Sequence, residues 1–350
     1  AMSAGISGLK AHMDALNVVG NNVANVNTQG YKPGRVTFME SIYSTQSAGS
    51  AGTATVGGTN PRQTGYGVGI GTIDLDMSSR SLDSTGRGMD CAIQGDGFFL
   101  VGDKTHDIDS MDALKGLTLT RVGNFEFRDG YLTDGQGNVV YGFITRSNGD
   151  APGTTPGDKP STDLVPIRLP MKSTDPNSKG DAVYVGVDNQ TGANVYPDND
   201  PAATVDGFVD LENISIDKNG KITGTNKDTG DPVVVGYIAL GSVENLNGVL
   251  HTEGPYYTAG DAAGDIRAGT PGNSVTGNLR NDKITDGNNV VAPDSALAEG
   301  SGATLMTGFL EASGTDLAAE FANMIIYQRG YQANTRIVTV TDTMLEELDN

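Results

Sequence analysis

The chain has 350 residues, which is enough for two or three domains and for a sizeable hydrophobic core. Its 23 lysines and arginines against 43 acidic residues give a net charge of −20, so a general phosphate-binding surface is excluded and nucleic acid is a poor partner. Glycine, at 49 residues, is about twice as frequent as usual and tryptophan is absent, which favours turn-rich β structure over a compact enzyme core.

The first stretch of the chain predicts an amphipathic helix that ends near residue 27. Asparagines crowd the end of this stretch, where their side chains compete for backbone hydrogen bonds, and Gly30 can adopt a positive φ. We therefore expect Asn21, Asn22 and Asn25 to end the helix and to fix where the chain leaves it. Apolar positions alternate at spacings of four and three, as in the heptad of a helix that has a partner helix. These positions are Met2, Ile6, Leu9, Met13, Leu16, Gly20 and Val23.

Residues 29–70 are predicted to form an extended linker. The chain is small and polar here and has almost no periodicity. The glycine-rich segment at 65–71 does not fit G-x-G-x-x-G, and no basic residue follows closely to hold a phosphate. A nucleotide-binding loop is therefore not expected.

From residue 70 to about 144 the sequence predicts short strands separated by turns. Apolar and polar residues alternate over runs of four to eight, as in half-buried strands. Turn signals stand at Asp129-Gly130 and in the cluster at 135–138.

A boundary rich in proline and glycine follows at 147–163, and then further short strands run to about residue 235, with a turn at Asn219-Gly220. A third β-rich stretch precedes a region rich in glycine, aspartate and asparagine at about 260–303. Most of the chain between its two ends is therefore predicted to be β.

A second long helix is predicted over residues 315–349, where only Gly330 interrupts the pattern. Thr315 or Ser313 is expected to cap its start. At 1.5 Å per residue this helix would be about 50 Å long, which is long for a helix with no neighbour. Its four-three stripe is Leu317, Phe321, Met324, Gln328, Tyr331, Thr335, Val338, Asp342 and Leu345, with a second flank at Ile325, Ile337 and Leu348.

The two apolar stripes have two explanations. The terminal helices could pair within one monomer as an ordinary bundle seam, or the stripes could assemble one chain with another. Gln328, Thr335 and Asp342 would weaken an isolated pair but can specify register in a larger assembly. Spacing alone leaves both explanations open. The predicted fold class is mainly β and multi-domain, with paired terminal α-helices that form a helical-assembly domain.

The sequence offers few catalytic or metal-binding candidates. His12, His106 and His251 are expected in a helix seam and two loops, and G-x-S-x-G, H-E-x-x-H and Walker lysine motifs do not occur. The faint calcium loop at 217–220 lacks a further ligand because Lys221 stands in that position, so a β-turn is expected. No enzymatic activity, metal or cofactor is therefore expected.

Cys91 is the single cysteine, so an intramolecular disulfide framework and a zinc cluster of thiolates are excluded. It lies beside alternating apolar residues, which predicts a buried thiol; a reactive thiol that cross-links covalently is the minor alternative. No run approaches the ~18 to 20 apolar residues that span a bilayer, and the layout of a secretory signal peptide is missing. Any export is therefore expected to use another route.

Three groups of motifs occur together in this chain. The N-terminal group is GLKAH at 8–12 with LNVVGNNVANVNTQGYK at 16–32, and the C-terminal motif is MIIYQRGYQANTR at 324–336. The middle group is AIQGDGFF, RVGNF and DGYL, whose motif residues include Gln94, Gly95, Gly97, Phe98, Asn124 and Phe125. Together they resemble the family of bacterial flagellar rod and hook proteins.

Within that family the C-terminal motif looks more like hook proteins than distal-rod proteins. The sequence after Arg329 is Gly-Tyr-Gln, where distal-rod relatives tend to have an Ala-Tyr-Glu type of sequence. The insert at about 147–235 is also what a hook subunit would carry and a short rod subunit would lack.

The resemblance implies an axial structural subunit that self-assembles into a curved, flexible tube, a universal joint that passes motor torque from rod to filament and encloses the export channel. It implies an inner-core domain (1–28 and 314–350), the linker, a β-rich middle domain (71–146 and 236–313) and an inserted β-rich outer domain (147–235). The terminal helices would be disordered in the monomer and fold on assembly. Lateral seams would be built by Leu9, Met13, Leu16, Val23, Phe321, Ile325, Tyr331, Val338 and Leu345.

The implied partners are further copies of the chain, the distal rod protein, the hook cap and the hook-filament junction protein, without nucleic acid or membrane insertion. The implied location is the extracellular hook of the flagellum, reached by flagellar type III export without a cleaved signal peptide. Distal rod and hook-filament junction subunits are the nearest alternatives. A secreted β-rich glycan-binding or hydrolytic protein, with terminal helices that only oligomerise it, is the alternative of another class.

Overall fold

A computed structural model describes residues 2–104, 108, 111–146, 159–183, 186–187, 194–195, 205–272, 277–278, 297–298 and 302–349. The chain divides into two compact units. We call Ala1–Asp76 with Ser313–Asn350 the helical unit and Met77–Ala312 the β unit. Long helices at both ends and a body rich in strands confirm the predicted fold class.

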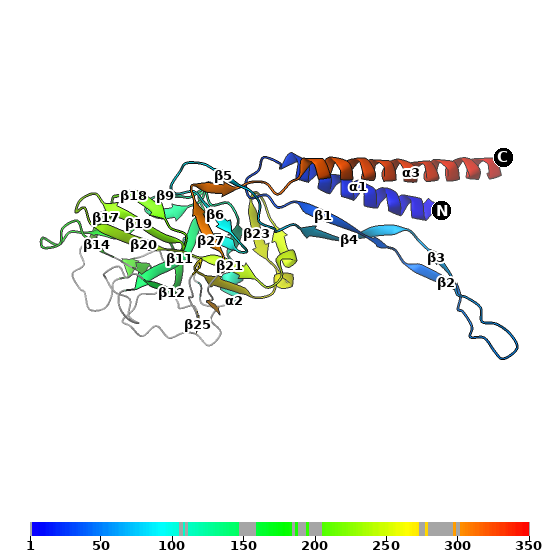
Figure 1. The fold of residues 1–350 in the computed structure, drawn as a ribbon, viewed down its shortest axis with the longest axis horizontal. Coiled ribbons are helices and arrows are strands. Elements are labelled where there is room, and N and C mark those ends of the chain that lie inside the picture. Colours follow the sequence, from blue (N-terminus) through cyan, green and yellow to red (C-terminus); the bar gives the residue numbers. More distant parts are fainter. Residues whose placement is uncertain are drawn as a thin grey trace. The chain divides into compact units, whose positions relative to one another are not determined.

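The helical unit combines two long helices with two antiparallel strand pairs (Figure 1). Strand β1 pairs with β4, and β2 pairs with β3, so that much of the segment predicted as a linker forms a β ribbon. Helix α1 contacts α3 on one side and the β1–β4 pair on another. The elements are α1 (Met2–Ala24), β1 (Gly34–Glu40), β2 (Tyr43–Ser47), β3 (Arg62–Gly65), β4 (Val68–Leu75) and α3 (Leu317–Asp349).

The ends of the helices differ in detail from the sequence-based predictions. Helix α1 ends at Ala24, a few residues before the predicted end. Helix α3 is capped by Asp316, whose Oδ1 accepts hydrogen bonds from the backbone N–H groups of Ala318 (3.0 Å) and Ala319 (3.2 Å). The predicted caps were wrong because Thr315 donates its hydroxyl to the backbone carbonyl of Asn22 instead.

A row of threonines runs along the C-terminal half of α3. The hydroxyls of Thr335, Thr339 and Thr341 each donate to the backbone carbonyl four residues earlier, at 2.6–2.9 Å, and Thr343 donates to the carbonyls of both Val340 and Thr339. These bonds share carbonyls that already accept within the helix, an arrangement that slightly weakens and often bends a helix.

The β unit is built around one large sheet whose central path runs β18-β19-β20-β11-β7-β21-β24-β26-β25. Pairing is antiparallel along this path except between β24 and β26. Strands β27 and β28 return to pair with β6 and β5, which joins the start and end of the unit. The strands predicted within 70–144, on both sides of the Asn219-Gly220 turn and in the third β-rich stretch at 233–243 are therefore present.

The first half of the β unit contains β5 (Leu82–Ser84), β6 (Cys91–Gln94), β7 (Phe98–Gly102), α2 (Met111–Lys115), β8 (Thr118–Thr120), β9 (Glu126–Arg128), β10 (Tyr131–Thr133), β11 (Val139–Arg146), β12 (Lys159–Pro166), β13 (Met171–Ser173), β14 (Ala182–Val183), β15 (Gly186–Val187) and β16 (Asn194–Val195). The second half contains β17 (Val205–Phe208), β18 (Leu211–Ile216), β19 (Lys221–Asn226), β20 (Pro232–Ile238), β21 (Leu240–Val243), η1 (Leu246–Gly248), β22 (Val249–His251), β23 (Tyr256–Ala259), η2 (Asp261–Ala263), β24 (Ile266–Gly269), β25 (Gly277–Asn278), β26 (Leu297–Ala298), β27 (Thr304–Thr307) and β28 (Phe309–Glu311).

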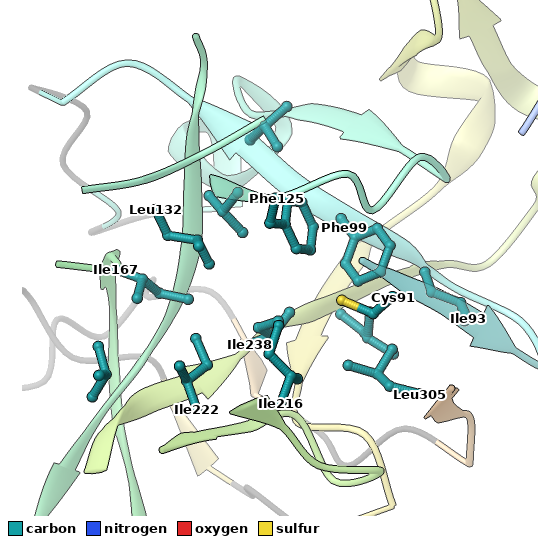
Figure 2. Packing of buried hydrophobic residues seen from close by; sticks show 14 of the residues in the cluster. Cys91, Ile93, Phe99, Phe125, Leu132, Ile167, Ile216, Ile222, Ile238 and Leu305 are labelled. Carbon is teal, nitrogen blue, oxygen red and sulfur yellow. The ribbon is translucent and has the colours of Figure 1, made fainter. Parts of the chain in front are cut away.

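The hydrophobic core of the β unit gathers side chains from strands far apart in the sequence (Figure 2). Phe99 and Phe125 meet edge to face with ring centroids 4.9 Å apart, and both are fully buried. Burial of large aromatic and branched residues is the main favourable term in folding a domain of this kind. The labelled members in Figure 2 are Cys91, Ile93, Phe99, Phe125, Leu132, Ile167, Ile216, Ile222, Ile238 and Leu305.

Two predicted turns are confirmed. Asp129 and Gly130 both have positive φ (51° and 80°) and join β9 to β10, as a two-residue hairpin turn requires. The ring of Phe208 packs so close to Gly130 that an added Cβ would lie 2.4 Å from it, so this glycine is needed for space as well as conformation. At 217–220, Asp217 Oδ1 accepts from the backbone N–H groups of Asn219 and Lys221, which makes the segment a β-turn.

Other predictions have mixed outcomes. His251 ends strand β22 and stacks edge to face on Tyr257 at 4.9 Å, so its predicted loop position was wrong. His106, the boundary at 147–158 and most of 273–301 lie outside the described residues. The four-part domain division remains a prediction. Among the described residues, no helix is both long and apolar enough to cross a membrane.

Candidate functional site

The face of α1 that packs inward is lined by small residues. Its buried members are Gly5, Gly8, Ala11, Ala15, Val19 and Asn22. A Cβ added at Gly8 would lie 2.7 Å from the Asn334 side chain, and one at Gly5 would lie 3.2 Å from Val338. Glycine therefore allows α1 and α3 to approach closely. Because this face buries few large apolar side chains, the pair gains little hydrophobic stabilisation from its own contact.

His12 lies in the middle of this seam among aromatic rings. Its ring centroid is 5.3 Å from that of Phe38 on β1 and 6.3 Å from that of Tyr327 on α3, and Phe38 and Tyr327 are 5.7 Å apart. An added Cβ at Gly330 would lie 2.6 Å from the His12 ring. His12 Nδ1 is buried without a hydrogen-bond partner. Burial lowers the pKa of His12 from its ordinary value, because a charged imidazolium would be poorly solvated there.

We expect the helical unit to lose stability in acid because of His12. A lowered pKa means that the unfolded chain takes up the proton first, so the stabilisation is complete above pH 6.5 and is lost as the pH falls through the folded-state pKa. Phenylalanine in place of His12 keeps the aromatic packing and should remove this loss between pH 7 and 5. Thermal unfolding followed by helical circular dichroism measures it, since α1 and α3 dominate the described helix. Equal pH dependence in His12→Phe and the wild type would contradict it.

The predicted apolar stripes lie largely on the outside of the helix pair. Met13 is 47% exposed and Ile325 is 53% exposed, while Leu9, Leu16 and Val23 are half-buried. Phe321, Tyr331 and Leu345 are also exposed, and Val338 turns inward toward Gly5. The two helices thus pair within one chain through a different face from the stripe. An intramolecular pair therefore exists, and most of the large stripe residues remain exposed; assembly of one chain with another through them stays a prediction.

Exposed large apolar side chains are confined almost entirely to the helical unit. Among the described residues they number 21, and 20 of them lie there, the exception being Leu250. Contiguous exposed apolar patches mark surfaces that bind another molecule. The 20 exposed side chains of the helical unit are Met2, Ile6, Met13, Phe38, Met39, Ile42, Tyr43, Val56, Tyr66, Ile73, Leu317, Phe321, Ile325, Ile326, Tyr331, Ile337, Val340, Met344, Leu345 and Leu348.

The asparagines at the end of α1 have distinct partners. Asn25 donates from its side chain to the carbonyl (2.9 Å) and the side-chain oxygen (3.1 Å) of Asn21, which closes the last turn. Asn22 is 1% exposed and binds the backbone of Gly34 at the start of β1. Gly30 has φ 68°, as expected for a chain that reverses after a helix.

The motif residues of the β unit surround Arg121. The guanidinium donates to the carbonyls of Gly95 (3.0 Å) and Gly97 (2.7 Å), and its Nε donates to the Glu311 carboxylate at 2.9 Å. Both glycines have positive φ, which lets the turn between β6 and β7 present its carbonyls to the cation. Arg121 and Glu311 are almost fully buried. The sequence analysis did not identify this pair as functional.

The remaining motif residues hold the same region together. Phe98 packs against Tyr257 with ring centroids 5.8 Å apart, and Phe125 is the edge-to-face partner in the core. Gln94 Oε1 accepts from the Thr304 hydroxyl at 3.4 Å, which links β6 to β27. Asn124 forms an isolated bridge with Asp90. These residues stabilise the β unit from within.

Cys91 is fully buried at the start of β6, and burial raises the pKa of its thiol. Because the thiolate is the reacting species, we expect alkylation by iodoacetamide to be at least about 100-fold slower in the native chain than in denaturant. Labelling time courses read by mass spectrometry check this expectation. Rapid native labelling would favour the reactive-thiol alternative.

The described residues contain no cluster of three or more histidine, cysteine or acidic side chains that could hold a metal ion.

Two signals in the sequence could have located the contact between α1 and α3, which the sequence analysis missed. Gly5, Gly8, Ala11, Ala15 and Val19 repeat at the helical spacing of three and four, and Gly330 falls opposite this face on the other helix. A stripe of small residues is harder to recognise than a stripe of large ones.

Comparisons with known proteins match both ends and the whole length of the chain. Residues 2–32 match the family described as flagella basal body rod protein, and residues 306–350 match flagellar basal body rod FlgEFG protein C-terminal. The flagellar basal-body rod protein FlgG of Bacillus subtilis is 31% identical over 99% of this chain and 96% of its own. The flagellar hook protein FlgE of Salmonella typhimurium is 27% identical over 99% of each chain, and that of Borreliella burgdorferi is 25% identical over 98% and 97%.

Proposed function

The chain belongs to the flagellar rod and hook protein family, and on this premise we propose that it is the subunit of the flagellar hook. Membership makes it a structural component of the flagellum. The finer proposal is that copies assemble into a curved, flexible tube that transmits torque from rod to filament and encloses the export channel.

The observation that carries this proposal is the apolar surface of the helical unit. In a chain with a net charge of −20, the described residues of the helical unit expose 20 large apolar side chains and those of the β unit expose one. Such a surface is costly in water and is removed when copies pack together. We propose that these faces form the lateral seams, with Phe321, Ile325, Tyr331 and Leu345 on α3 and Leu9, Met13, Leu16 and Val23 on α1.

The arrangement of the predicted domains extends the proposal. The terminal helices would line the inner wall, and the β unit, with the insert predicted at 147–235, would form the outer layers. Export without a cleaved signal peptide, and contacts with the distal rod, the hook cap and the hook-filament junction, are proposed from the family alone.

The distal rod is the second candidate, and one observation favours it. The alignment with FlgG spans 354 residues, close to the length of this chain, whereas the FlgE alignments span 426 and 468 residues. The Gly-Tyr-Gln sequence after Arg329 favours the hook.

Negative-stain microscopy of the concentrated, purified chain tests the proposal. Curved tubes support the hook, straight tubes support the rod, and globular particles with termini already protected from protease contradict assembly. Protection of both termini only in the polymer supports folding on assembly.

Single charges on the exposed stripes should abolish polymerisation. We expect Ile6→Asp and Ile325→Asp to reduce polymer yield at least about tenfold, because each would bury an unpaired carboxylate in a seam. Pelleting assays measure the yield. Leu250→Asp is the matched control, since Leu250 is similarly exposed but lies in the β unit. Undiminished polymer from the two helix variants would show that these faces are not seams.

A further inference from the structure

Four segments of the helical unit meet at the side chain of Asn22. Its Nδ2 donates to the carbonyl of Gly34 (2.8 Å) and to Glu320 Oε1 (3.1 Å), and its Oδ1 accepts from the Gly34 N–H (3.0 Å) and the Tyr31 hydroxyl (3.0 Å). The carboxamide thus pairs with Gly34 as a neighbouring peptide group would. We call this set of contacts the junction. It ties the end of α1, the following turn, the start of β1 and the start of α3 together.

The carboxyl group of Glu320 is the member of the junction whose hydrogen bonding is incomplete. Among the described residues, Asn22 is the one donor to its Oε1, and its Oε2 is buried without a hydrogen-bond partner. The helix N-terminus, which would favour an anion, already has Asp316 as its cap. A buried acceptor that lacks a partner carries its full desolvation cost, which is larger for an ionised group.

The ionisable groups around Glu320 do not neutralise it. Asp316 on the same helix is a like charge, and the hydroxyls of Tyr31 and Tyr327 are neutral and have their own pKa raised partly by Glu320. Among cations of the adjoining segments, Lys32 is buried with partners of its own and Arg35 faces Asp74 at 3.6 Å. No ion pair to Glu320 occurs among the described residues.

The pKa of Glu320 is raised above its ordinary value of 4.5, chiefly by burial and also by Asp316, against the opposing hydrogen bond from Asn22. Folding therefore favours the neutral carboxyl more than the unfolded chain does. Its stabilising contribution is complete below pH 4.5 and is lost as the pH rises through the folded-state pKa. At neutral pH the ionised group works against the junction.

We propose that Glu320 is a proton-controlled latch on the junction. Protonated, it keeps the turn, β1 and the start of α3 closed on Asn22; ionised, it lets these segments open more often. The latch requires a folded helical unit, as the single chain has it here, and does not depend on whether copies form hook or rod.

Hydrogen exchange of the full chain between pH 4.5 and 7.5 tests the latch. Protection factors, corrected for intrinsic exchange, are followed for residues 20–34 and 314–322. We expect wild-type protection there to fall about tenfold as the pH rises. In Glu320→Gln, which keeps the shape and an acceptor for Asn22 but removes the charge, protection should stay constant. Glu347→Gln, an exposed carboxylate on the same helix, should behave as the wild type.

Repeating the comparison in a His12→Phe background removes the opposite acid effect of the seam imidazole. A flat wild-type profile would overturn the proposal, and so would a profile that Glu320→Gln retains. Loss of the helices in Glu320→Gln would also overturn it, because the charge would then be required for folding.

Discussion

Replacing Arg121 by alanine should destabilise the β unit by about 3–5 kcal/mol, because the buried Glu311 carboxylate would keep the backbone N–H of Arg80 but lose the guanidinium that faces it. The guanidinium also donates to the carbonyls of Gly95 and Gly97, and these hydrogen bonds would be lost as well. Arg121→Lys should recover only part of the loss, since an ammonium lacks the planar fork that reaches both the carboxylate and the turn. Differential scanning calorimetry of the full chain measures the shift.

Arg128→Ala is the matched control for this prediction. Arg128 pairs with Glu126 at 3.0 Å on the surface, with both side chains about half exposed, so its removal should cost roughly 0–1 kcal/mol. Changing Arg121 and Glu311 together to methionine should cost less than Arg121→Ala, because no buried charge then remains. If Arg121→Ala and Arg128→Ala unfolded alike, the buried pair of Arg121 and Glu311 would not stabilise the β unit more than a surface pair does.

Leucine at Gly330 should separate the terminal helices and abolish polymerisation. The added side chain must enter the space of the His12 ring, which packs against the rings of Phe38 and Tyr327. Overpacking of this kind costs about 1–3 kcal/mol, and the seam has little hydrophobic stabilisation to offset it. Helical circular dichroism and polymer yield should both fall, although leucine is the better helix former at an isolated position.

Two variants distinguish a steric clash from other effects of Gly330→Leu. Gly20→Leu is the control, because no atom lies within 4 Å of the Cβ that it would add. Combining Gly330→Leu with His12→Ala vacates the space for the new side chain and should restore much of the helical signal. Failure of this double variant to recover would mean that the close approach of the helices is not set at this point.

The strands of the β unit were predictable because local signals agree with the fold. Alternating residues, an Asp-Gly hairpin turn and an Asn-Gly turn each specify the same structure that the sheet requires. The presence of both terminal helices followed equally from periodicity. The family motifs pointed to the assembly class directly, since the comparisons match the same residues at both ends.

The pairing face of the helices was not predictable from hydrophobicity. The stripes left open whether their large residues pack within one chain or between chains, yet Gly5, Gly8 and Gly330 form the close intramolecular contact and Ile325 stays outside. A hydrophobic stripe says that a face needs burial but does not say by which molecule. Nor did the sequence link Arg121 to Glu311, because a contact between residues 190 positions apart leaves no local pattern.

The threonine row gives α3 an uneven bending stiffness along its length. From Thr335 onward, hydroxyls share the carbonyls that hold successive turns together, whereas the first half of the helix has no such row among its described contacts. Thr335, Thr339 and Thr343 recur every four residues along one side of the helix, and Thr341 lies on nearly the opposite side. We therefore expect the C-terminal half of α3 to bend preferentially in one plane, and the half nearest Asp316 to stay straight.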